Sequence, residues 1–306
     1  MDTNKLVQGV FVWMVCNIKC SFCNTQYWTN TDKNYYTFYS FNKIKSTVLQ
    51  KKIKWATHII YEWWDFSIHP DIFKILSFWK TLWLKQSFQT NWVKLSDLNF
   101  VKKIKKAWVK VMNFSLHAFS EKVSDSISWV EGSFNKTIKW IINCNNIWIK
   151  TSIHFVIIKE NINQLEWFIM LMLKLKVNSL NFSMYIPIKN RNDDFHNKLL
   201  VDPIIVWREM SNMFDIYNNI INISKWKFKI DFKFHNIWRC IFRKNLHKYN
   251  YDFTLDRRDE VVSNKIGAWF YKKKECEKCI YYTYCPSFTY KYIKVYWDSF
   301  IKPILN

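Results

Sequence analysis

The first two-thirds of the chain alternates short runs rich in β-branched and aromatic residues with longer segments whose apolar residues recur at helical spacing. This alternation predicts parallel strands joined by helices. Strands are expected at Val7–Met14, Thr57–Glu62, Lys85–Thr90, Lys110–His117, Ile149–Ile157 and Ser179–Ile186. Helices are expected at Phe41–Lys52, Pro70–Phe78, Ser96–Lys106, Phe134–Asn143, Ile162–Leu175 and Pro203–Tyr217. The alternation fades after Tyr217, so we expect a core domain over residues 1–220 and a smaller extension over 221–306.

No apolar run in the chain reaches the ~18 residues that a membrane-spanning helix needs. The first five residues lack the basic and then apolar pattern of a secretory signal. The 8 Cys fall mostly in clusters with the spacing of metal ligands, which favours a reducing compartment over disulfide bonds. We therefore expect a cytoplasmic protein without membrane association.

The formal net charge is +22 and the pI is about 9.6, which raises the question of nucleic-acid binding. The lysines, however, are spread along the chain, as in the stretch Val101–Lys106 at the end of the predicted helix Ser96–Lys106. The chain is also rich in Lys, Asn, Ile, Phe and Tyr, whose codons are AT-rich, so genome composition explains part of the charge. Solvated helix faces are therefore favoured over a dedicated nucleic-acid site.

The most informative polar positions are three cysteines, Cys16, Cys20 and Cys23, which follow the first predicted strand. A cubane iron–sulfur cluster normally takes four thiolates, so three from one short loop leave one iron open to a further ligand. A zinc knuckle is the alternative, but zinc sites usually combine paired CxxC units with a fourth ligand, and no fourth ligand stands near this loop. The CxxxCxxC spacing resembles that of the radical S-adenosylmethionine (radical SAM) enzymes.

This resemblance implies an α/β fold, namely an open parallel (β/α)6 partial TIM barrel with a small irregular C-terminal cluster-binding extension. It implies a catalytic [4Fe–4S] cluster whose open iron is chelated by the amino and carboxylate groups of S-adenosylmethionine (SAM). Electron transfer to SAM then releases a 5′-deoxyadenosyl radical. Active sites of parallel barrels lie at the carboxyl ends of the strands. Both the cysteine loop and the segment after the second predicted strand fall at that end.

The same resemblance assigns further residues to the cofactor. Trp63, Trp64 and Asp65 stand where radical SAM proteins carry two glycines and a glutamate, and they would bind the methionyl amine. Phe22 would pack beside the adenine of SAM. Ser115, at the end of the fourth predicted strand, would meet the ribose or methionine end of SAM, with a solvent-facing serine as an equal alternative. Asp65 is shorter than Glu by one methylene but can still accept from an ammonium group.

A second set of cysteines comprises Cys240, Cys276, Cys279 and Cys285. The CxxC spacing followed by a third cysteine resembles the C-terminal extension called SPASM, or its shorter form twitch, which binds an auxiliary [4Fe–4S] cluster. Cys240 is the natural fourth ligand. Thr289 stands where the full SPASM pattern has another cysteine, so one auxiliary cluster is expected. The alternative is a zinc site formed by the same cysteines, with His247 as a candidate further ligand.

The composition contains a second anomaly, because the chain has 3 Gly and 18 Trp. An average usage of about 7% predicts roughly 21 Gly in a chain of this length, which is the number of Gly and Trp together. Turns and close backbone approaches are expected at Trp63, Trp64, Trp92, Trp108, Trp140, Trp148 and Trp297. A Trp is strained where φ must be positive. We therefore predict that the Trp residues are Gly encoded by reassigned UGA codons, the alternative being a truly Trp-rich protein.

The sequence thus predicts a radical SAM oxidoreductase or maturase that abstracts hydrogen from its substrate, provided that Trp63 and Trp64 are Gly in the native protein. A peptide or protein is the first substrate class that the family resemblance implies, and a small molecule is the second. A flavodoxin or ferredoxin would donate the electron. Two other functions stay open, namely a zinc-stabilised basic nucleic-acid-binding protein and a catalytically inactive barrel.

Overall fold

The computed structural model describes the chain over the ranges 7–11, 16, 18–23, 38–62, 65–91, 98–187, 191–224, 228–238, 240, 270–282, 285 and 287–305. The chain forms two compact units. The first comprises residues 1–116, 124–153 and 175–178, and the second comprises residues 117–123, 154–174 and 179–306. The division into residues 1–220 and 221–306 that the sequence suggests stays a prediction.

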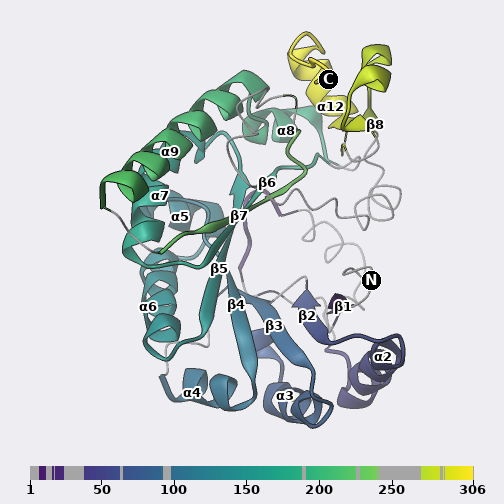
Figure 1. Cartoon of the computed structure of the whole chain (residues 1–306), viewed down its shortest axis with the longest axis vertical. Helices are drawn as coiled ribbons and strands as arrows, with labels where there is room; N and C mark the ends of the chain where they lie inside the picture. Colours follow the sequence, from purple (N-terminus) through teal and green to yellow (C-terminus); the bar gives the residue numbers. More distant parts are fainter. Residues whose placement is uncertain are drawn as a thin grey trace. The chain divides into compact units, whose positions relative to one another are not determined.

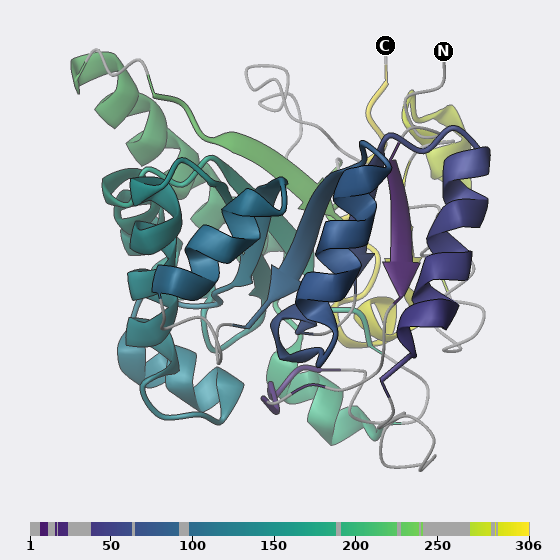
Figure 2. The ribbon, with the colours of Figure 1, turned by 90° about the horizontal axis from the view of Figure 1, so that it is seen from below.

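The first unit alternates strands and helices in the order that the sequence predicts (Figure 1). Its strands are β1 (Val7–Phe11), β2 (His58–Glu62), β3 (Lys85–Thr90), β4 (Val109–Ser115) and the first half of β5 (Lys150–Ile157). Its helices are α2 (Phe41–Ile53), α3 (Ile72–Thr81), α4 (Leu98–Lys106), most of α5 (Glu121–Ser128) and α6 (Ser133–Asn146), with a 3-10 turn at Phe66–Ile68. Figure 2 shows α3 and α4 in front of these strands, which they cover on one face.

The second unit continues the alternation and then adds short elements. It contains β6 (Ser179–Met184), β7 (Asp231–His235), β8 (Phe270–Tyr271), β9 (Phe288–Thr289), α7 (Leu165–Lys174), α8 (Asp193–Leu199), α9 (Pro203–Ser224) and α12 (Tyr290–Tyr296). Two 3-10 turns lie at Ile162–Gln164 and Lys274–Lys278. Strands β8 and β9 pair antiparallel in a separate small sheet.

Strands β1 to β7 form one sheet in sequential order. The pairs β1–β2, β2–β3, β3–β4 and β6–β7 are parallel. This is the predicted α/β partial TIM barrel, an open parallel sheet with alternating helices. The sequence did not predict β7, which lies beyond residue 220 and pairs with β6. The parallel arrangement places the segments after β1, β2, β3 and β4 at the carboxyl end of the sheet, where barrel active sites lie.

Aromatic and aliphatic side chains fill the space between the strands and helices. In the second unit, Phe155 of β5 packs against Phe168 of α7 with ring centroids 4.6 Å apart, and Phe182 of β6 stacks on Phe234 of β7. In the first unit, Tyr61 at the end of β2 stacks on Phe66 with centroids 4.2 Å apart, and both side chains are fully buried. The burial of Phe66 holds the segment after β2 against the sheet.

Five helices of the chain end in the same unusual way. Residues Trp55, Trp83, Trp108, Trp129 and Trp148 follow α2, α3, α4, α5 and α6 with φ between 56° and 66°. After α2, the Trp55 N–H donates to the Lys52 carbonyl, and the Ala56 N–H donates to the Lys51 carbonyl. These two bonds define a Schellman motif, in which the residue with positive φ is usually Gly. The same pair of bonds closes α3 at Trp83 and α6 at Trp148.

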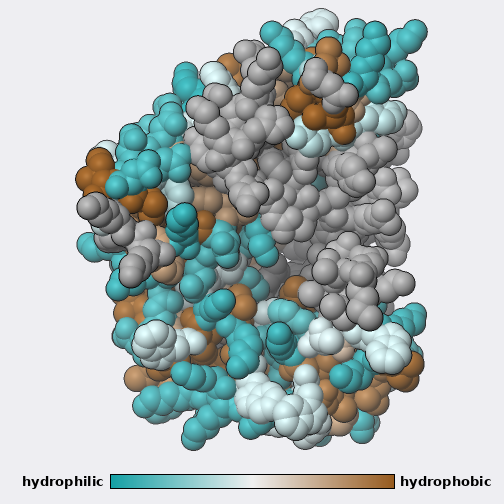
Figure 3. Space-filling view, viewed as in Figure 1, coloured by the Kyte–Doolittle hydropathy of each residue, from teal (hydrophilic) through white to brown (hydrophobic). Residues whose placement is uncertain are grey.

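The described surface mixes hydrophilic and apolar side chains. On the face shown in Figure 3, teal hydrophilic residues are interspersed with pale and brown ones and do not form a single stripe. Within the residues described, no helix combines the length and the apolar character that crossing a membrane requires.

Candidate metal and cofactor site

The cysteine loop after β1 is anchored by backbone hydrogen bonds to the end of α5. The Lys19 N–H donates to the Ser128 carbonyl over 3.2 Å, and the Ser21 N–H donates to the Ile127 carbonyl over 2.8 Å. These bonds also satisfy carbonyls at the last turn of α5, which the helix itself leaves without partners. Within the loop, the Cys23 N–H donates to the Cys20 carbonyl. The three predicted ligands thus share one tight turn held by a helix end.

The thiols of this loop lie close enough to affect one another. Cys16 is exposed at the surface of the described residues, yet desolvation of its thiol and the neighbouring Cys23 and Asp65 raise its pKa. Burial also raises the pKa of Cys20 well above its usual value, with contributions from Cys23 and Cys16. Thiolates are the form that binds iron, so the metal must displace protons when it binds. A cationic metal centre stabilises the ionised form of thiols that would otherwise stay protonated.

Asp65 is the predicted partner of the SAM ammonium group, and it is only 1% exposed. Its Oδ1 accepts from the Ser67 N–H at 2.9 Å, the Ser67 hydroxyl at 2.5 Å and the Thr90 hydroxyl at 2.8 Å. Its Oδ2 is buried and has no hydrogen-bond partner among the described residues. Burial raises the pKa of Asp65, while the Ser67 and Thr90 hydroxyls lower it. A buried carboxylate oxygen without a donor fits a ligand that brings its own positive charge.

The end of β3 connects this carboxylate to the cysteine loop. Thr90 donates its hydroxyl to Asp65, and the next residue, Asn91, donates its side-chain amide to the Cys16 sulfur over 3.2 Å. Both residues are buried. The sequence analysis placed Thr90 at the end of a strand and gave neither residue a role in the site, so it missed both contacts. The signal was the position of Thr90 and Asn91 at the carboxyl end of a parallel strand, beside the ends of β2 and β1.

The structure describes only some of the other residues that the sequence analysis singled out. Ser115 is the last residue of β4 and is half-buried, as a residue at the carboxyl end of the sheet should be. Phe22 lies in the cysteine loop and is half-buried. Trp63, Trp64 and Trp92 lie outside the described residues. The roles of Ser115 and Phe22 toward SAM stay predictions.

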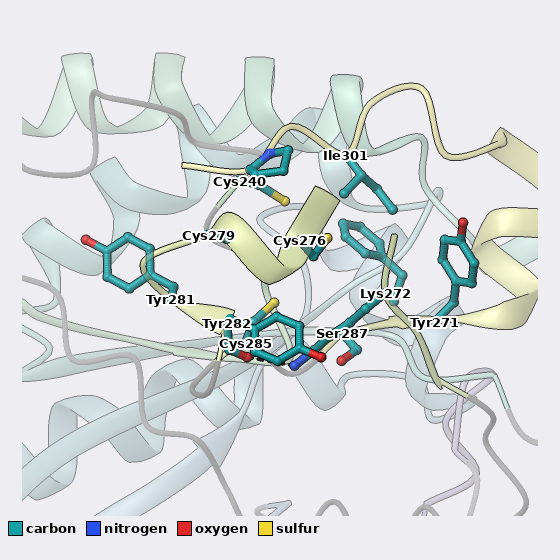
Figure 4. A pocket seen from close by; sticks show the side chains of 12 residues that line it. Cys240, Tyr271, Lys272, Cys276, Cys279, Tyr281, Tyr282, Cys285, Ser287 and Ile301 are labelled. Atoms are coloured by element: carbon teal, nitrogen blue, oxygen red, sulfur yellow. Dashed lines mark hydrogen bonds between the residues drawn. The ribbon is translucent and has the colours of Figure 1, made fainter. Parts of the chain in front are cut away.

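The second cysteine set gathers around one pocket of the second unit. Cys240, Cys276, Cys279 and Cys285 all line it (Figure 4). The sulfur atoms of Cys240, Cys276 and Cys285 turn toward the same space. Burial raises the pKa of Cys240 to about 12, with added contributions from the thiols of Cys285, Cys276 and Cys279. The structure therefore brings the four residues together that the sequence grouped only by spacing.

The rest of this pocket is lined by aromatic and aliphatic residues, one serine and one lysine. Lys272 donates to the Tyr282 carbonyl at 2.7 Å and lies over the Tyr282 ring at 4.2 Å from its centroid. Lys272 also lowers the pKa of Cys276 and Cys285, against the larger effect of burial. Among the described residues, no three His, Cys, Asp or Glu side chains converge closely enough for a single metal ion. The possible zinc ligand His247 lies outside the described residues.

Three residues that could be taken for ligands have structural roles. The Val156 N–H donates to Nδ1 of His117, and Nε2 of His154 is 2.6 Å from the Ser183 hydroxyl. Burial lowers the pKa of His117 to about 3 and of His154 to about 4, so both are neutral near pH 7. Cys144 is fully buried in α6. These residues belong to the core, as their positions in strand and helix patterns predict.

Several solved structures share this architecture. Streptococcus suis SuiB bound to S-adenosylmethionine has a TM-score of 0.60 and 16% identity, over 83% of this chain and 54% of that one. The same protein bound to the precursor peptide SuiA has a TM-score of 0.59 and 16% identity, over 83% of this chain and 54% of that one. Native anSMEcpe with AdoMet and the Kp18Cys peptide has a TM-score of 0.60 and 13% identity, over 73% of this chain and 63% of that one. The chain spans about half the length of the SuiB structures, and at these identities the likeness shows the fold.

A family model gives the assignment that the fold alone cannot give. No curated protein sequence matches the chain. The model that matches is described as the radical SAM superfamily, and it covers residues 10–172, more than half of the 306 residues. The matched segment includes the cysteine loop, Asp65 and the end of β3. The chain therefore belongs to the radical SAM superfamily.

Proposed function

We propose that the protein is a radical SAM oxidoreductase or maturase that abstracts a hydrogen atom from a peptide or protein. Cys16, Cys20 and Cys23 would hold the catalytic [4Fe–4S] cluster, and the segment 63–65 would bind the methionyl amine. When bound, the cluster and SAM supply the 5′-deoxyadenosyl radical, so the protein needs no acid–base pair for that step. The chain's own residues hold the cofactors, orient the substrate and exclude water.

One observation carries this proposal. The cysteine loop and the buried carboxylate come from different strand ends, yet Asp65 is near enough to Cys16 to raise the pKa of its thiol. A carboxylate beside thiolates is unfavourable unless cations lie between them. An iron–sulfur centre and a sulfonium cofactor with an ammonium group supply those cations. The two predicted halves of the site are therefore adjacent and complementary to the same ligand pair.

Replacing Asp65 with Asn should weaken SAM binding by about 10- to 100-fold, because a hydrogen bond to a charged group contributes roughly 1.5–3 kcal/mol. Asn keeps the shape and can still accept from Ser67 and Thr90. The measurement is the Kd for SAM of anaerobically reconstituted protein, with iron content determined for each sample. Asp71→Asn, at the N-terminal cap of α3, is the matched control and should bind SAM normally. Unchanged affinity in Asp65→Asn would remove this residue from the cofactor site.

The second cysteine set would hold one auxiliary [4Fe–4S] cluster, with Cys240 as its fourth ligand. Four cysteines line one pocket, and burial raises the pKa of three of them, Cys240, Cys276 and Cys285, which supports a shared metal centre. A single zinc ion with Zn–S distances near 2.3 Å would draw its sulfurs to within roughly 4 Å of one another. The preference for a cluster over zinc rests on the CxxC spacing with its third cysteine, which resembles the cluster-binding extension, and zinc stays the alternative. Lys272 offsets part of the negative charge of such a centre.

Changing Cys276, Cys279 and Cys285 together to alanine should reduce the iron content from about eight to about four per chain. The cleavage of SAM should persist, because the radical forms at the other cluster, while modification of the true substrate should be lost. Iron and sulfide analysis and quantified 5′-deoxyadenosine provide the two readouts. If SAM cleavage disappears from a folded variant that still holds four irons, the two clusters do not divide the work in this way.

The activity also requires that glycine occupy the Trp positions, and the backbone supports that proposal. Nine non-Gly residues of the described chain have positive φ, and six of them are Trp. Only a few per cent of non-Gly residues have positive φ, and bulky ones are outliers. Five of the six follow helices at the place where Gly is the usual residue. Helix α7 is the contrasting case, because Lys176 takes that place with φ 54°.

Trp297 has the most unusual backbone conformation of these six residues. It ends α12 with φ 60° and ψ −177°, a region of conformational space that is essentially confined to Gly. Its side chain is 77% exposed, so packing does not offset the strain. Trp55 and Trp148 are likewise more than four-fifths exposed. Six strained and mostly exposed indoles in one chain are readily explained if each codon is read as Gly.

Two other Trp residues bear on the same question. Trp140 lies inside α6 with normal helical φ, not at the turn that the sequence analysis expected. Its side chain is fully buried, and its Nε1 has no hydrogen-bond partner among the described residues, which costs about 1–3 kcal/mol. Trp238 differs, because its Nε1 donates to the Ser287 carbonyl at 2.6 Å. The strongest support therefore comes from the helix ends.

At positions 63 and 64, Gly would let the backbone approach the methionyl amine, whereas two indoles would collide with it and leave an inactive barrel.

A peptide substrate is supported by the proteins that share the fold. SuiB was solved with the precursor peptide SuiA, and anSMEcpe with the Kp18Cys peptide. We extend that substrate class to this chain together with a flavodoxin or ferredoxin as electron donor and the cytoplasm as its compartment. The alternative of a basic zinc-dependent nucleic-acid-binding protein rests on the net charge of +22 and on the second set of cysteines.

A further inference from the structure

The end of β3 holds a contact that the proposed chemistry does not use. Asn91 follows the last residue of β3 and is 5% exposed. Its Nδ2 donates a hydrogen bond to Sγ of Cys16 over 3.2 Å, across 75 positions of sequence. Sulfur is a weak acceptor as a thiol and a much better one as a metal-bound thiolate. The contact therefore gains strength when Cys16 binds iron.

The position of Asn91 is fixed by the sheet and not by the cysteine loop. In β3, Thr90 pairs with Phe114 of β4, and both residues are buried. Thr90 is tied in addition to Asp65 through its hydroxyl. A donor on a rigid strand end keeps its orientation when the charge of the cluster changes, so it is preorganised for the more negative state.

We propose that Asn91 is a positioning residue of the catalytic cluster, whose amide hydrogen bond to Cys16 raises the reduction potential of that cluster. This inference rests on the proposed assignment of Cys16 as an iron ligand. Reduction adds a single electron to the cluster from an external reductant, and the added negative charge is shared with the ligand sulfurs. A hydrogen-bond donor to one of these sulfurs stabilises the reduced form more than the oxidised form.

The test is a redox titration of the cluster followed by electron paramagnetic resonance. The parent is the full chain with Gly at the 18 Trp positions, in which Cys276, Cys279 and Cys285 are alanine so that one cluster gives the signal. Asn91→Leu removes the donor at similar volume, and Asn91→Asp removes it and adds a negative charge. We expect a more negative midpoint potential in Asn91→Leu and a larger negative shift in Asn91→Asp. Asn146→Leu, on the exposed end of α6, should match the parent.

Three outcomes separate this inference from the proposed function. Midpoint potentials equal to the parent in both Asn91 variants, with normal iron content, overturn the role of Asn91 and leave the cluster assignment intact. A parent that binds no cluster contradicts the proposed function itself. If Asn91→Leu fails to hold a cluster, Asn91→Ala decides the matter, because it removes the donor without adding charge: a more negative midpoint potential supports the role of Asn91, and a potential equal to that of the parent overturns it.

Discussion

Replacing Cys16, Cys20 and Cys23 together with alanine should remove one [4Fe–4S] cluster and abolish the cleavage of SAM. The reason is that the three thiols share one anchored loop, and that no other cysteine of the first unit can replace them, because Cys144 is buried in α6. We expect iron to fall from about eight to about four per chain. The loss of 5′-deoxyadenosine should be complete to the limit of detection, in contrast to the retained cleavage in the variant of the second cysteine set.

The control for this prediction is Cys144→Ala, which removes a thiol of the same unit without touching the loop. It should retain both iron content and cleavage, apart from the modest loss of stability that a small core cavity brings. The assignment of the catalytic cluster is refuted if the triple variant, folded as judged by circular dichroism, still produces 5′-deoxyadenosine.

The second large effect concerns the Trp residues. A chain with Gly at all 18 Trp positions should fold and bind SAM, whereas the printed chain should do so poorly. At each residue with positive φ, Gly relieves about 1–2 kcal/mol of backbone strain. At 63 and 64, Gly removes the side chains that would occupy the cofactor site. The gene should carry UGA codons at these positions, and peptide mass spectrometry of the native protein should find Gly.

A partial set of replacements distinguishes strain relief from a general effect of removing indoles. Gly at the six residues Trp55, Trp83, Trp108, Trp129, Trp148 and Trp297 should raise the Tm. Gly at Trp167 and Trp207, which lie within helices, should lower it, since Gly costs roughly 0.5–1 kcal/mol inside a helix. Finding UGG codons at Trp63 and Trp64, or Trp itself in native peptides, would end the recoding hypothesis and with it the expectation of activity.

The periodic part of the fold could be predicted from the sequence because each element carries its own pattern. Strand β3 has the predicted bounds, and α9 begins at Pro203 as predicted but extends to Ser224. Strand β7 was missed, because its pairing with β6 lies in tertiary structure and its five residues alone give too short a pattern. The short helices α5 and α8 escaped for the same reason.

The candidate site, like the fold, could be predicted only in part from the sequence. Spacing alone grouped the cysteines, because metal ligands in loops are close in sequence. Asn91 could not be found in that way, since only the register of parallel strands brings it to Cys16. The ties of Asp65 to Ser67 and Thr90, and its buried Oδ2, required side-chain geometry. The positive φ of the Trp residues was predicted at Trp108, Trp148 and Trp297 from turn positions, while Trp140 proved to lie inside a helix.

The most direct test of the account is the reaction of the anaerobically reconstituted, glycine-containing protein with SAM and a strong reductant. We expect 5′-deoxyadenosine and methionine to form in equal amounts, at a rate that depends on the catalytic cluster. Liquid chromatography with mass spectrometry quantifies both products. A protein that holds iron and sulfide and binds SAM, but forms neither product under these conditions, would contradict the assignment of radical SAM chemistry to this chain.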